Sequence, residues 1–189
     1  MSFRKPHVRM SVAEYLEWEK DSTVRHEYLD GEVYAMSGAT RRHNRVANNL
    51  NIQLSLRLGG GPCQVFISDV KVYIEAFNFF YYPDLVVTCD PEDNDEYFAK
   101  RPVLVVEVES PSTSAIDRRE KLIAYRKLES LQEYLMLAQD RISCEIYRRD
   151  QAGNWWSEQL GPDRELRLES VGVSLPLASL YDGVTFPEP

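Results

Sequence analysis

The segment that most constrains the fold is the run Pro102–Glu109, PVLVVEVE, which is apolar on both of its alternating faces until Glu107. Such a run is typical of a central strand that is covered on both sides of its sheet. Because side chains alternate along a strand, Glu107 and Glu109 share one face near its end. An ionised carboxylate on a buried strand is costly unless it is paired or binds a metal. Glu107 is therefore a candidate metal ligand. The alternatives are an ion pair with an arginine or a place at the rim of the sheet.

The N-terminal part of the chain contains strong helix and turn signals. Ser11 followed by Glu14 forms a capping box, which predicts a short helix over residues 12–20. Asp30-Gly31 is a favoured type I′ turn pair, so RHEYLDGEVYAM is predicted to form a β-hairpin. Apolar residues at helical spacing predict a longer helix over about residues 40–58, and the Gly-Gly-Gly-Pro segment that follows ends it.

Strand-like segments rich in Val, Ile, Tyr and Phe fill most of the remaining chain, on both sides of a third helix. That helix is predicted in SPSTSAIDRREKLIAYRKLESL, with Thr113 or Ser114 as its N-cap. The strands are predicted in CQVFIS, DVKVYIE, YYPDLVVT and PVLVVEVE, then in EYLMLA, SCEIYRRD and WWSEQL, followed by short strands and a last turn near residues 177–181. This order predicts an α/β (α+β) fold in which a mixed central sheet is flanked by helices.

Length and composition fit one domain with one core. The chain has 189 residues, of which 43% are hydrophobic, and it shows no repeat or linker. We expect a core over about residues 40–140, an N-terminal helix and hairpin over residues 11–37, and C-terminal strands over residues 141–181. No stretch of about 18 apolar residues predicts a membrane span. The start of the chain lacks the apolar run of a secretory signal peptide, so a cytoplasmic location is expected.

The three cysteines, Cys63, Cys89 and Cys144, lie far apart in the sequence and form no CxxC pair. No histidine stands near them at metal-ligand spacing. We therefore expect neither a disulfide framework nor a zinc site, in keeping with a reducing cytosol.

The net charge of the chain bears on how it can bind nucleic acids. The net charge of −8 counts against a general nucleic-acid binder, because Lys and Arg contacts to phosphate supply most non-specific affinity. A nuclease is not excluded, since its basic surface can be local. The candidate phosphate-facing residues are Arg41, Arg42 and Arg45 in one cluster and Arg118 and Arg119 in another. Solvated helix surface is the competing interpretation of both clusters.

Asp84 is a second candidate metal ligand, because it stands at the start of a strong strand within YYPDLVVT. Pro83 cannot donate a hydrogen bond to a neighbouring strand, so a bulge or a sheet margin is expected at this point. A Pro-Asp step alone is ordinary turn chemistry. Asp84 is therefore a candidate metal ligand because Glu107 is present, and not on its own evidence.

Lys121 stands in the middle of the apolar stripe of the third helix. At about 100° per residue it shares one arc with Asp117, Ala124, Tyr125 and Leu128, while most other charged residues of the helix lie opposite. A lysine on this arc points towards the sheet and its carboxylates. The alternative is a simple Asp117–Lys121 pair four residues apart on the helix.

Asp84, the acidic pair Glu107 and Glu109 on the next strand, and Lys121 on the following helix resemble the PD-(D/E)XK nuclease superfamily, and more narrowly the Uma-two family of endonucleases. The matching segments, in the family's order, are RHEYLDGEVYAMSG, RRHNRVANNL, VFISDVKV, YYPDLVVT, PVLVVEVESPSTSAIDRREKLIAYRKL and LQEYLML. In the wider superfamily the lysine stands two residues after the second acid, where this chain has Glu109. In the Uma-two family it lies on the following helix, where Lys121 stands.

The resemblance implies a restriction-endonuclease-like core and hydrolysis of phosphodiester bonds, most directly in DNA, by a homodimer with bound Mg²⁺ (or Mn²⁺). Asp84 and Glu107 would hold the metal, which activates a water molecule. Lys121 would orient that water or stabilise the developing negative charge. Crowded acids are also expected to raise the pKa values of the carboxyl groups.

Five further residues are weaker candidates. Glu109 is either a third metal ligand or a rim residue. Glu27 and Glu32 add carboxylates if the hairpin folds over the site, and Asp69, at the start of a strand, does so in the same way. His43 either contacts substrate or is an ordinary core histidine.

Two other functions stay open at this point. The acidic charge and the Glu109 departure are compatible with a nuclease-fold protein that binds or regulates and whose metal site is weak or idle. The same site chemistry also serves an RNA-directed or small-nucleotide phosphodiesterase.

Overall fold

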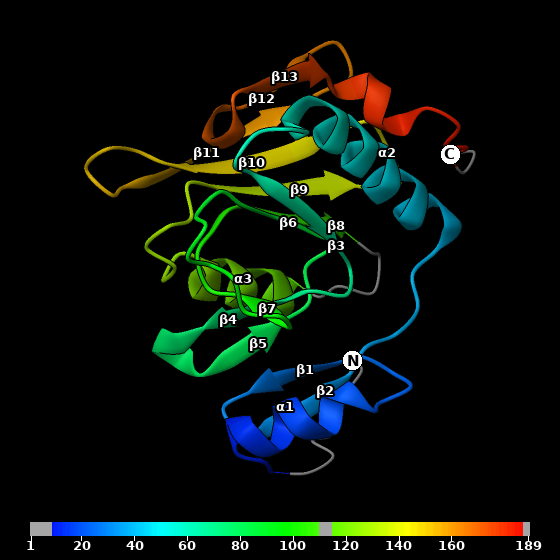
Figure 1. The fold of residues 1–189 in the computed structure, drawn as a ribbon. Helices are drawn as coiled ribbons and strands as arrows, with labels where there is room; N and C mark the ends of the chain where they lie inside the picture. Colours follow the sequence, from blue (N-terminus) through cyan, green and yellow to red (C-terminus); the bar gives the residue numbers. More distant parts are fainter. Residues whose placement is uncertain (1–8, 110–114, 187–189) are drawn as a thin grey trace.

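The computed structural model of the chain describes residues 9–109 and 115–186 (Figure 1). The predicted N-cap residues Thr113 and Ser114 lie outside the described residues, and so does the side chain of Asp117.

The N-terminal helix and hairpin form as predicted. Their elements are α1 (Val12–Lys20), β1 (His26–Leu29) and β2 (Glu32–Ala35). Ser11 caps the helix, since its side chain accepts the Glu14 backbone N–H and the Glu14 carboxylate accepts the Ser11 backbone N–H at 2.8 Å. Asp30 and Gly31 have φ values of 46° and 99°. These positive angles are what a type I′ turn requires, so the hairpin prediction is confirmed.

A six-stranded mixed sheet lies at the centre of the molecule, in the order β11-β10-β9-β8-β6-β3. Its strands are β3 (Gln64–Ile67), β6 (Leu85–Thr88), β8 (Pro102–Glu109), β9 (Glu133–Ala138), β10 (Cys144–Arg149) and β11 (Trp155–Leu160). Strands β8 and β9 run parallel, and the other neighbouring pairs are antiparallel. The apolar run PVLVVEVE is thus an inner strand, as predicted.

The third helix is the crossover between the two parallel strands. Parallel neighbours need a connection that returns along the sheet, and α3 (Ala115–Tyr125) lies in this connection. The helix is shorter than the segment in which it was predicted. After Tyr125 the hydrogen bonds change to those of turns, such as Lys127 N–H to the Ala124 carbonyl at 3.0 Å, and Leu131 is buried beyond them.

A second sheet contains the hairpin and was not predicted. Its order is β2-β1-β5-β4-β7. The added strands are β4 (Lys71–Ile74), β5 (Phe79–Tyr81) and β7 (Phe98–Ala99). A separate pair consists of β12 (Glu165–Leu168) and β13 (Val173–Pro176). Short 3-10 turns span Glu75–Phe77, Glu169–Val171 and Leu177–Tyr181. The segment YYPDLVVT therefore belongs to two sheets. The chain leaves β5 and enters β6 at Pro83-Asp84, where a sheet margin was expected.

Apolar clusters cover both faces of the six-stranded sheet. On one face, Leu104 and Val106 pack with α2 (Arg41–Leu58) and with the C-terminal segment. On the other face, Val105 packs in a cluster that contains residues of α3 and also residues of β4. Helix α3 therefore lies between the two sheets, as Figure 1 shows.

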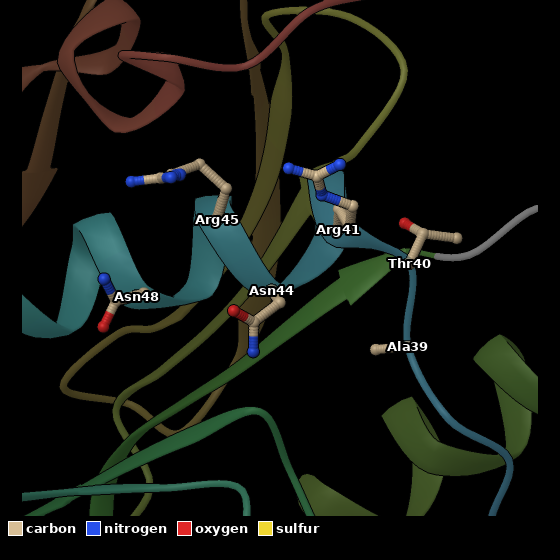
Figure 2. A pocket seen from close by; sticks show the side chains of 6 residues that line it. All are labelled: Ala39, Thr40, Arg41, Asn44, Arg45 and Asn48. Carbon is tan, nitrogen blue, oxygen red and sulfur yellow. The ribbon is translucent and has the colours of Figure 1, made fainter.

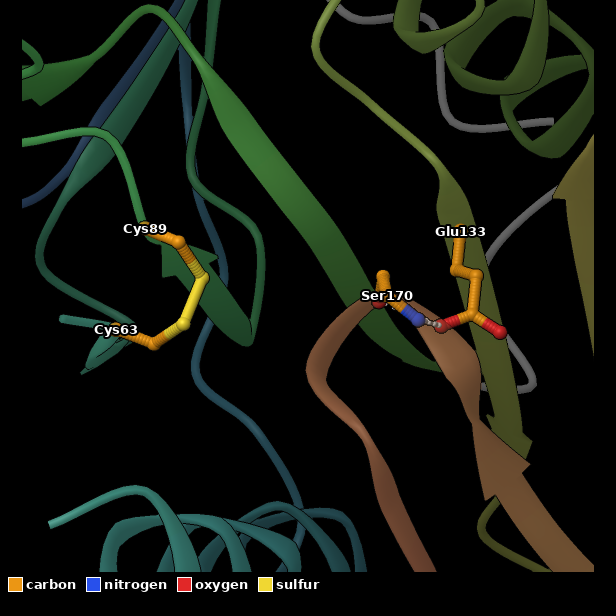
Figure 3. The surroundings of a disulfide bond; sticks show 4 residues. All are labelled: Cys63, Cys89, Glu133 and Ser170. Carbon is orange, nitrogen blue, oxygen red and sulfur yellow. Dashed lines mark hydrogen bonds between the residues drawn. A yellow bond between two sulfur atoms is a disulfide. The ribbon is translucent and has the colours of Figure 1, made fainter. Parts of the chain in front are cut away.

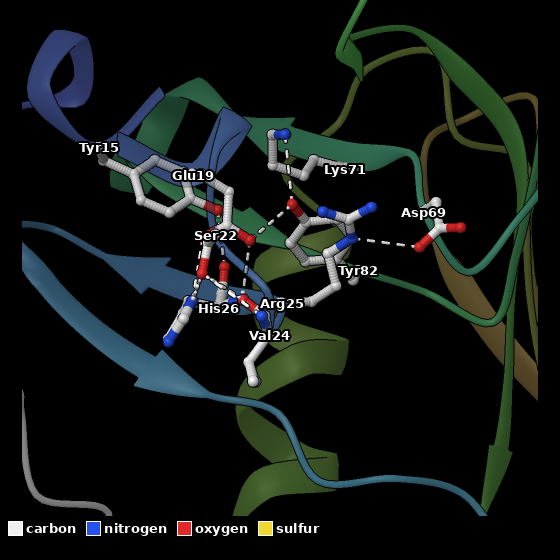
Figure 4. A network of polar contacts seen from close by, with 9 residues as sticks. All are labelled: Tyr15, Glu19, Ser22, Val24, Arg25, His26, Asp69, Lys71 and Tyr82. Atoms are coloured by element: carbon white, nitrogen blue, oxygen red, sulfur yellow. Dashed lines mark hydrogen bonds and ion pairs between the residues drawn. The ribbon is translucent and has the colours of Figure 1, made fainter. Parts of the chain in front are cut away.

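A buried polar network fastens α1 to the strands beneath it (Figure 4). The Glu19 carboxylate, which is 1% exposed, accepts the His26 backbone N–H at 2.9 Å and the Tyr82 hydroxyl at 3.0 Å. Lys71 donates to that hydroxyl at 3.3 Å, and the Tyr15 hydroxyl donates to the His26 carbonyl at 2.6 Å. Buried polar groups that are satisfied in this way specify one packing arrangement. Tyr82, which belongs to this network, stands two residues before Asp84 in the chain.

The expectation that the cysteines form no disulfide is wrong. Cys63 and Cys89 form a disulfide bond (Figure 3), with Cα atoms 4.0 Å apart, and Cys144 is free and buried. The reason is strand register. Gln64 pairs with Thr88 in the antiparallel β3–β6 ladder, so Cys63 and Cys89 are the next opposite pair. The two cysteines are 26 residues apart in the sequence, and strand pairing brings them together.

Within residues 9–109 and 115–186, no helix combines the length and the apolar character that a membrane crossing requires.

Truncation of Leu104 tests the packing of the central strand. Leu104 is 0% exposed, whereas Leu56 on α2 is 76% exposed. Leu104→Ala should lower the free energy of unfolding by about 2–5 kcal/mol, because it removes buried methyl groups and leaves a cavity. Leu56→Ala should change it by less than about 0.5 kcal/mol. Urea denaturation of both variants measures the difference, and equal values would contradict this assignment of the core.

Candidate active site

Asp84 is held at the end of β6 against the neighbouring strand. Its Oδ2 atom accepts the Val108 backbone N–H at 2.7 Å and lies 3.1 Å from His43 Nε2. Its own carbonyl accepts the Ser68 N–H at 3.1 Å. The side chain is 18% exposed, so it is oriented by the protein and still reaches solvent.

Glu107 stands beside Asp84 because of the register of two strands. Leu85 pairs with Val106 in the antiparallel β6–β8 ladder, so Asp84 and Glu107 are the next opposite positions. Opposite side chains in a ladder share a face. Glu107 Oε1 accepts hydrogen bonds from Lys121 Nζ and from the Tyr125 hydroxyl, both at 3.1 Å. The two predicted acids therefore meet on the face that α3 covers.

Lys121 reaches this face from α3, as the helical arc predicts. Its Nζ atom is 2.8 Å from Glu27 Oε1 and 3.1 Å from Glu107 Oε1, and it lies 5.3 Å from the centre of the Tyr81 ring. Burial opposes the charged ammonium, but the charges of Glu107 and Glu27 outweigh it, and the pKa of Lys121 stands well above its ordinary value. Lys121 is therefore a mostly shielded cation, 12% exposed, whose ion pairs are to Glu107 and Glu27 and not to Asp84.

The environment changes the acidity of Glu107. Burial, and the charges of Asp84 and Glu27, raise the pKa of its carboxyl to about 7, although the Lys121 ammonium acts in the opposite direction. The expectation of raised carboxyl pKa values is confirmed for this residue. Burial is the largest cause, ahead of the crowding of acids that motivated the expectation.

His43 contacts an acid of the site. It lies on the first turn of α2, whose N-cap is Thr40, and its Nε2 atom lies 3.1 Å from Asp84 Oδ2. Burial favours the neutral imidazole, but the hydrogen bond and the charge of Asp84 outweigh it, so the pKa of His43 is raised. The histidine is thus neither an ordinary core residue nor a free surface group.

The structure brings Glu27 into the site and gives the other auxiliary acids different partners. Glu109 lies 2.8 Å from Arg118 Nη1. Glu32 lies 3.8 Å from Arg9 and accepts the Tyr34 hydroxyl. Asp69, 72% exposed, lies 3.1 Å from Arg25. Glu109 thus forms an ion pair with an arginine, and its side chain is 31% exposed.

Two contact residues were not singled out from the sequence as parts of the site. Tyr125 donates to Glu107, and its spacing of four residues from Lys121 on the apolar arc is the signal that would have found it. The Val108 backbone N–H, which fixes Asp84, carries no signal in the residue types, because only the strand register places it.

The basic clusters have different surroundings. A polar groove on α2 is lined by Ala39, Thr40, Arg41, Asn44, Arg45 and Asn48 (Figure 2). The Nε atom of Arg42 is shielded from solvent and has no acceptor among the described residues. Arg118 forms ion pairs with Glu109 and Glu145, whereas Arg119 is exposed.

The protein donors available to a metal are hard oxygen atoms. In the part of the chain that the structure describes, no group of three or more His, Cys, Asp or Glu side chains is placed to hold a metal ion. The two predicted acids, Asp84 and Glu107, offer carboxylate oxygens and are 18% and 16% exposed. Such a set fits Mg²⁺, which needs only one or two carboxylates because it keeps several waters and binds substrate phosphate.

Comparison with known proteins assigns the chain to a family. The Uma2 family model, described as "Putative restriction endonuclease", matches residues 12–178. The chain belongs to the Uma2 family. The predicted family is therefore confirmed.

Two proteins of Synechocystis sp. are similar to this Uma2 protein over most of their length. The uncharacterized protein slr1290 is 36% identical over 182 residues, which is 96% of both chains. The uncharacterized protein sll1609 is 32% identical over 168 residues, which is 87% of this chain and 95% of the relative.

A solved structure shares the fold of this Uma2 protein. The crystal structure of a "putative nuclease belonging to DUF820" from Anabaena variabilis matches with a TM-score of 0.75 at 14% identity, over 93% of this chain and 99% of that one. The mixed α/β fold predicted from the order of helices and strands is confirmed, and so is the nuclease-like fold that the family resemblance implies.

The Lys121–Glu107 contact of this Uma2 protein predicts a shift that can be measured. Lys121→Met removes the positive charge that lowers the pKa of Glu107, so this pKa should rise above its value of about 7. A carbon-13 NMR titration of the side-chain carboxyl groups measures it. Lys20→Met, which removes an exposed lysine paired with Glu17, is the control and should leave Glu107 unchanged. An unchanged or lower pKa in Lys121→Met would contradict the contact.

Proposed function

We propose that this protein is a magnesium-dependent endonuclease that hydrolyses phosphodiester bonds in DNA, with Asp84, Glu107 and Lys121 as catalytic residues. The observation that carries the proposal is the contact of a mostly shielded ammonium with Glu107, whose neighbour across the β6–β8 ladder is Asp84. Membership of the Uma2 family and the nuclease-like fold support the same reaction class.

Asp84 and Glu107 are the residues that would hold Mg²⁺ (or Mn²⁺). Both are partly exposed oxygen donors, on adjacent strands and on one face. When bound, the cation supplies a Lewis acid that polarises a phosphoryl oxygen and lowers the pKa of a water molecule. The Val108 N–H and His43 fix the orientation of Asp84, and Tyr125 fixes Glu107.

Lys121 is proposed to stabilise negative charge that develops on the phosphate. An ammonium has three donors, and two of them are directed to Glu27 and Glu107 among the described residues. The third can donate to a phosphate oxygen in a site with little exposure to water, where such a bond is strong. The raised pKa keeps this amine charged at neutral pH.

The groove on α2 is proposed to bind the phosphate backbone. It presents Arg41 and Arg45 with Asn44 and Asn48 along one side of the helix, as Figure 2 shows. His43 of the same helix contacts Asp84, so the groove begins within one turn of the proposed metal site. Guanidinium and amide groups donate well to phosphate oxygens.

A homodimer is proposed as the active form, because two symmetric sites cut both strands of a duplex most simply. A cytoplasmic location is proposed with it, where DNA is the accessible substrate.

Plasmid nicking tests the proposed reaction. With Mg²⁺ or Mn²⁺ the wild-type protein should nick supercoiled DNA. Glu107→Ala and Lys121→Ala should lower the rate by about 10²–10³-fold, because each removes a group that acts on the reacting phosphate. Agarose-gel assays of the initial rate measure the effect.

Matched controls remove the same charges from exposed positions. Glu165→Ala loses a carboxylate paired with Arg167, and Lys20→Ala loses an amine paired with Glu17, both on the surface. Both should nick like the wild type. Equal residual activity in all variants would reveal a contaminant and refute the catalytic set. Absence of Mn²⁺ binding in calorimetry would favour an idle nuclease-fold module, and cleavage of RNA but not of duplex DNA would favour the RNA-directed alternative.

The groove makes a separate prediction about binding. Arg41→Ala and Arg45→Ala should each weaken DNA binding at low salt without changing sequence preference, and each should reduce the slope of log affinity against log salt by about 1. Fluorescence anisotropy at several salt concentrations measures both. Arg141→Ala, which removes an exposed arginine paired with Asp140, is the control. Unchanged slopes in the Arg41 and Arg45 variants would exclude this groove as a phosphate contact.

A further inference from the structure

Glu27 lies closer to the catalytic amine than Glu107 does. Lys121 Nζ is 2.8 Å from Glu27 Oε1 and 3.1 Å from Glu107 Oε1. The side chain of Glu27 is 4% exposed, against 12% for Lys121 and 16% for Glu107. An ion pair shielded from water is stronger and less mobile than one on the surface. Glu27 is therefore the inner of the two carboxylates that hold the amine.

The two carboxylates come from different sheets. Glu27 stands on β1, which pairs with β2 and β5 in the second sheet. Glu107 stands on β8 in the six-stranded sheet, and Lys121 on α3 lies between them. The Tyr81 ring, 5.3 Å from Nζ, closes a further side of the amine. The N-terminal hairpin thus contributes a charged group to the site that the six-stranded sheet and α3 also form.

Glu107 alone is poorly suited to fix the position of Lys121. In the proposed function Glu107 also holds a divalent cation, and this cation would repel the ammonium and draw on the same carboxylate charge. Glu27 supplies a second negative charge to the amine that does not depend on Glu107. Glu27 can therefore hold Lys121 while Glu107 holds the metal.

We propose that Glu27 is a positioning residue, which keeps the Lys121 ammonium in the site while Glu107 binds the cation. This inference rests on the proposed function, and it assigns to Glu27 no contact with the substrate. Because Glu27 is nearly buried, its loss should displace the amine without altering the surface that meets DNA.

Glu27→Gln is the test variant, since it keeps the shape of the side chain and removes its charge. At saturating Mn²⁺ its kcat for nicking should fall by about 10- to 100-fold, because a displacement of about 1 Å in a catalytic group has effects of this size. Its KM for DNA and its affinity for Mn²⁺ should not change. Glu32→Gln is the matched control, because Glu32 lies on the same face of the same hairpin but contacts Arg9 and Tyr34.

Two measurements do not depend on activity. Nitrogen-15 NMR of the Lys121 ammonium should show a slowly exchanging signal in the wild type and in Glu32→Gln, and this signal should be shifted or lost in Glu27→Gln. Thermal melting of Glu27→Gln, Lys121→Met and the double variant forms a mutant cycle. The double variant should melt higher than the sum of the two single losses implies, because it removes both charges of one pair. This cycle also decides the matter if Glu27→Gln alone folds poorly.

The results separate this inference from the proposed function. A wild-type kcat or an unchanged ammonium signal in Glu27→Gln would overturn the inference, and so would additive losses in the cycle. Weaker Mn²⁺ binding with an unchanged kcat at saturation would also overturn it, because Glu27 would then be a metal ligand. If the wild type cleaves no nucleic acid, the proposed function fails, and the NMR signal and the cycle still determine whether Glu27 holds Lys121.

Discussion

The positive charge of Lys121 holds together the part of the structure in which the chemistry is proposed to occur. It lies between the carboxylates of Glu27 and Glu107, which belong to two different sheets. Without it, the buried Glu27 and the partly exposed Glu107 would repel one another across the interface that α3 fills. This ammonium group therefore links the hairpin to the six-stranded sheet through α3, and it lowers the pKa of Glu107 against the effect of burial.

Local signals in the sequence predict most of the fold. The capping box at Ser11, the Asp30-Gly31 turn and the apolar run in β8 each act over a few residues, and each element lies where it is expected. Three of the site residues follow from similar patterns. Glu107 is anomalous in an apolar strand, Asp84 follows a proline that ends a strand, and Lys121 interrupts an apolar helical stripe. Each breaks the rule for its own element.

What the sequence does not predict depends on which strands pair. The Cys63–Cys89 bond and the Asp84–Glu107 juxtaposition both arise from the register of β6 with its two neighbours. A shift of one residue would turn these side chains to the other face. The position of Glu27 depends on the pairing of β1 with β5 in the second sheet. No residue pattern within the hairpin predicts this pairing. Long-range pairing of this kind leaves no local pattern to detect.

The crossover between β8 and β9 explains how an amine on a helix comes to lie beside a carboxylate on a strand. Parallel strands require the chain to return across the sheet, and this return passes over the face that bears Glu107. An amine on this return, at Lys121, therefore reaches the Glu107 carboxylate, whereas position 109 of β8 carries an acid that pairs with Arg118. Motif searches that demand a fixed spacing after the second acid will therefore pass over proteins with this architecture, whereas a search for a cation on the crossover helix would find them.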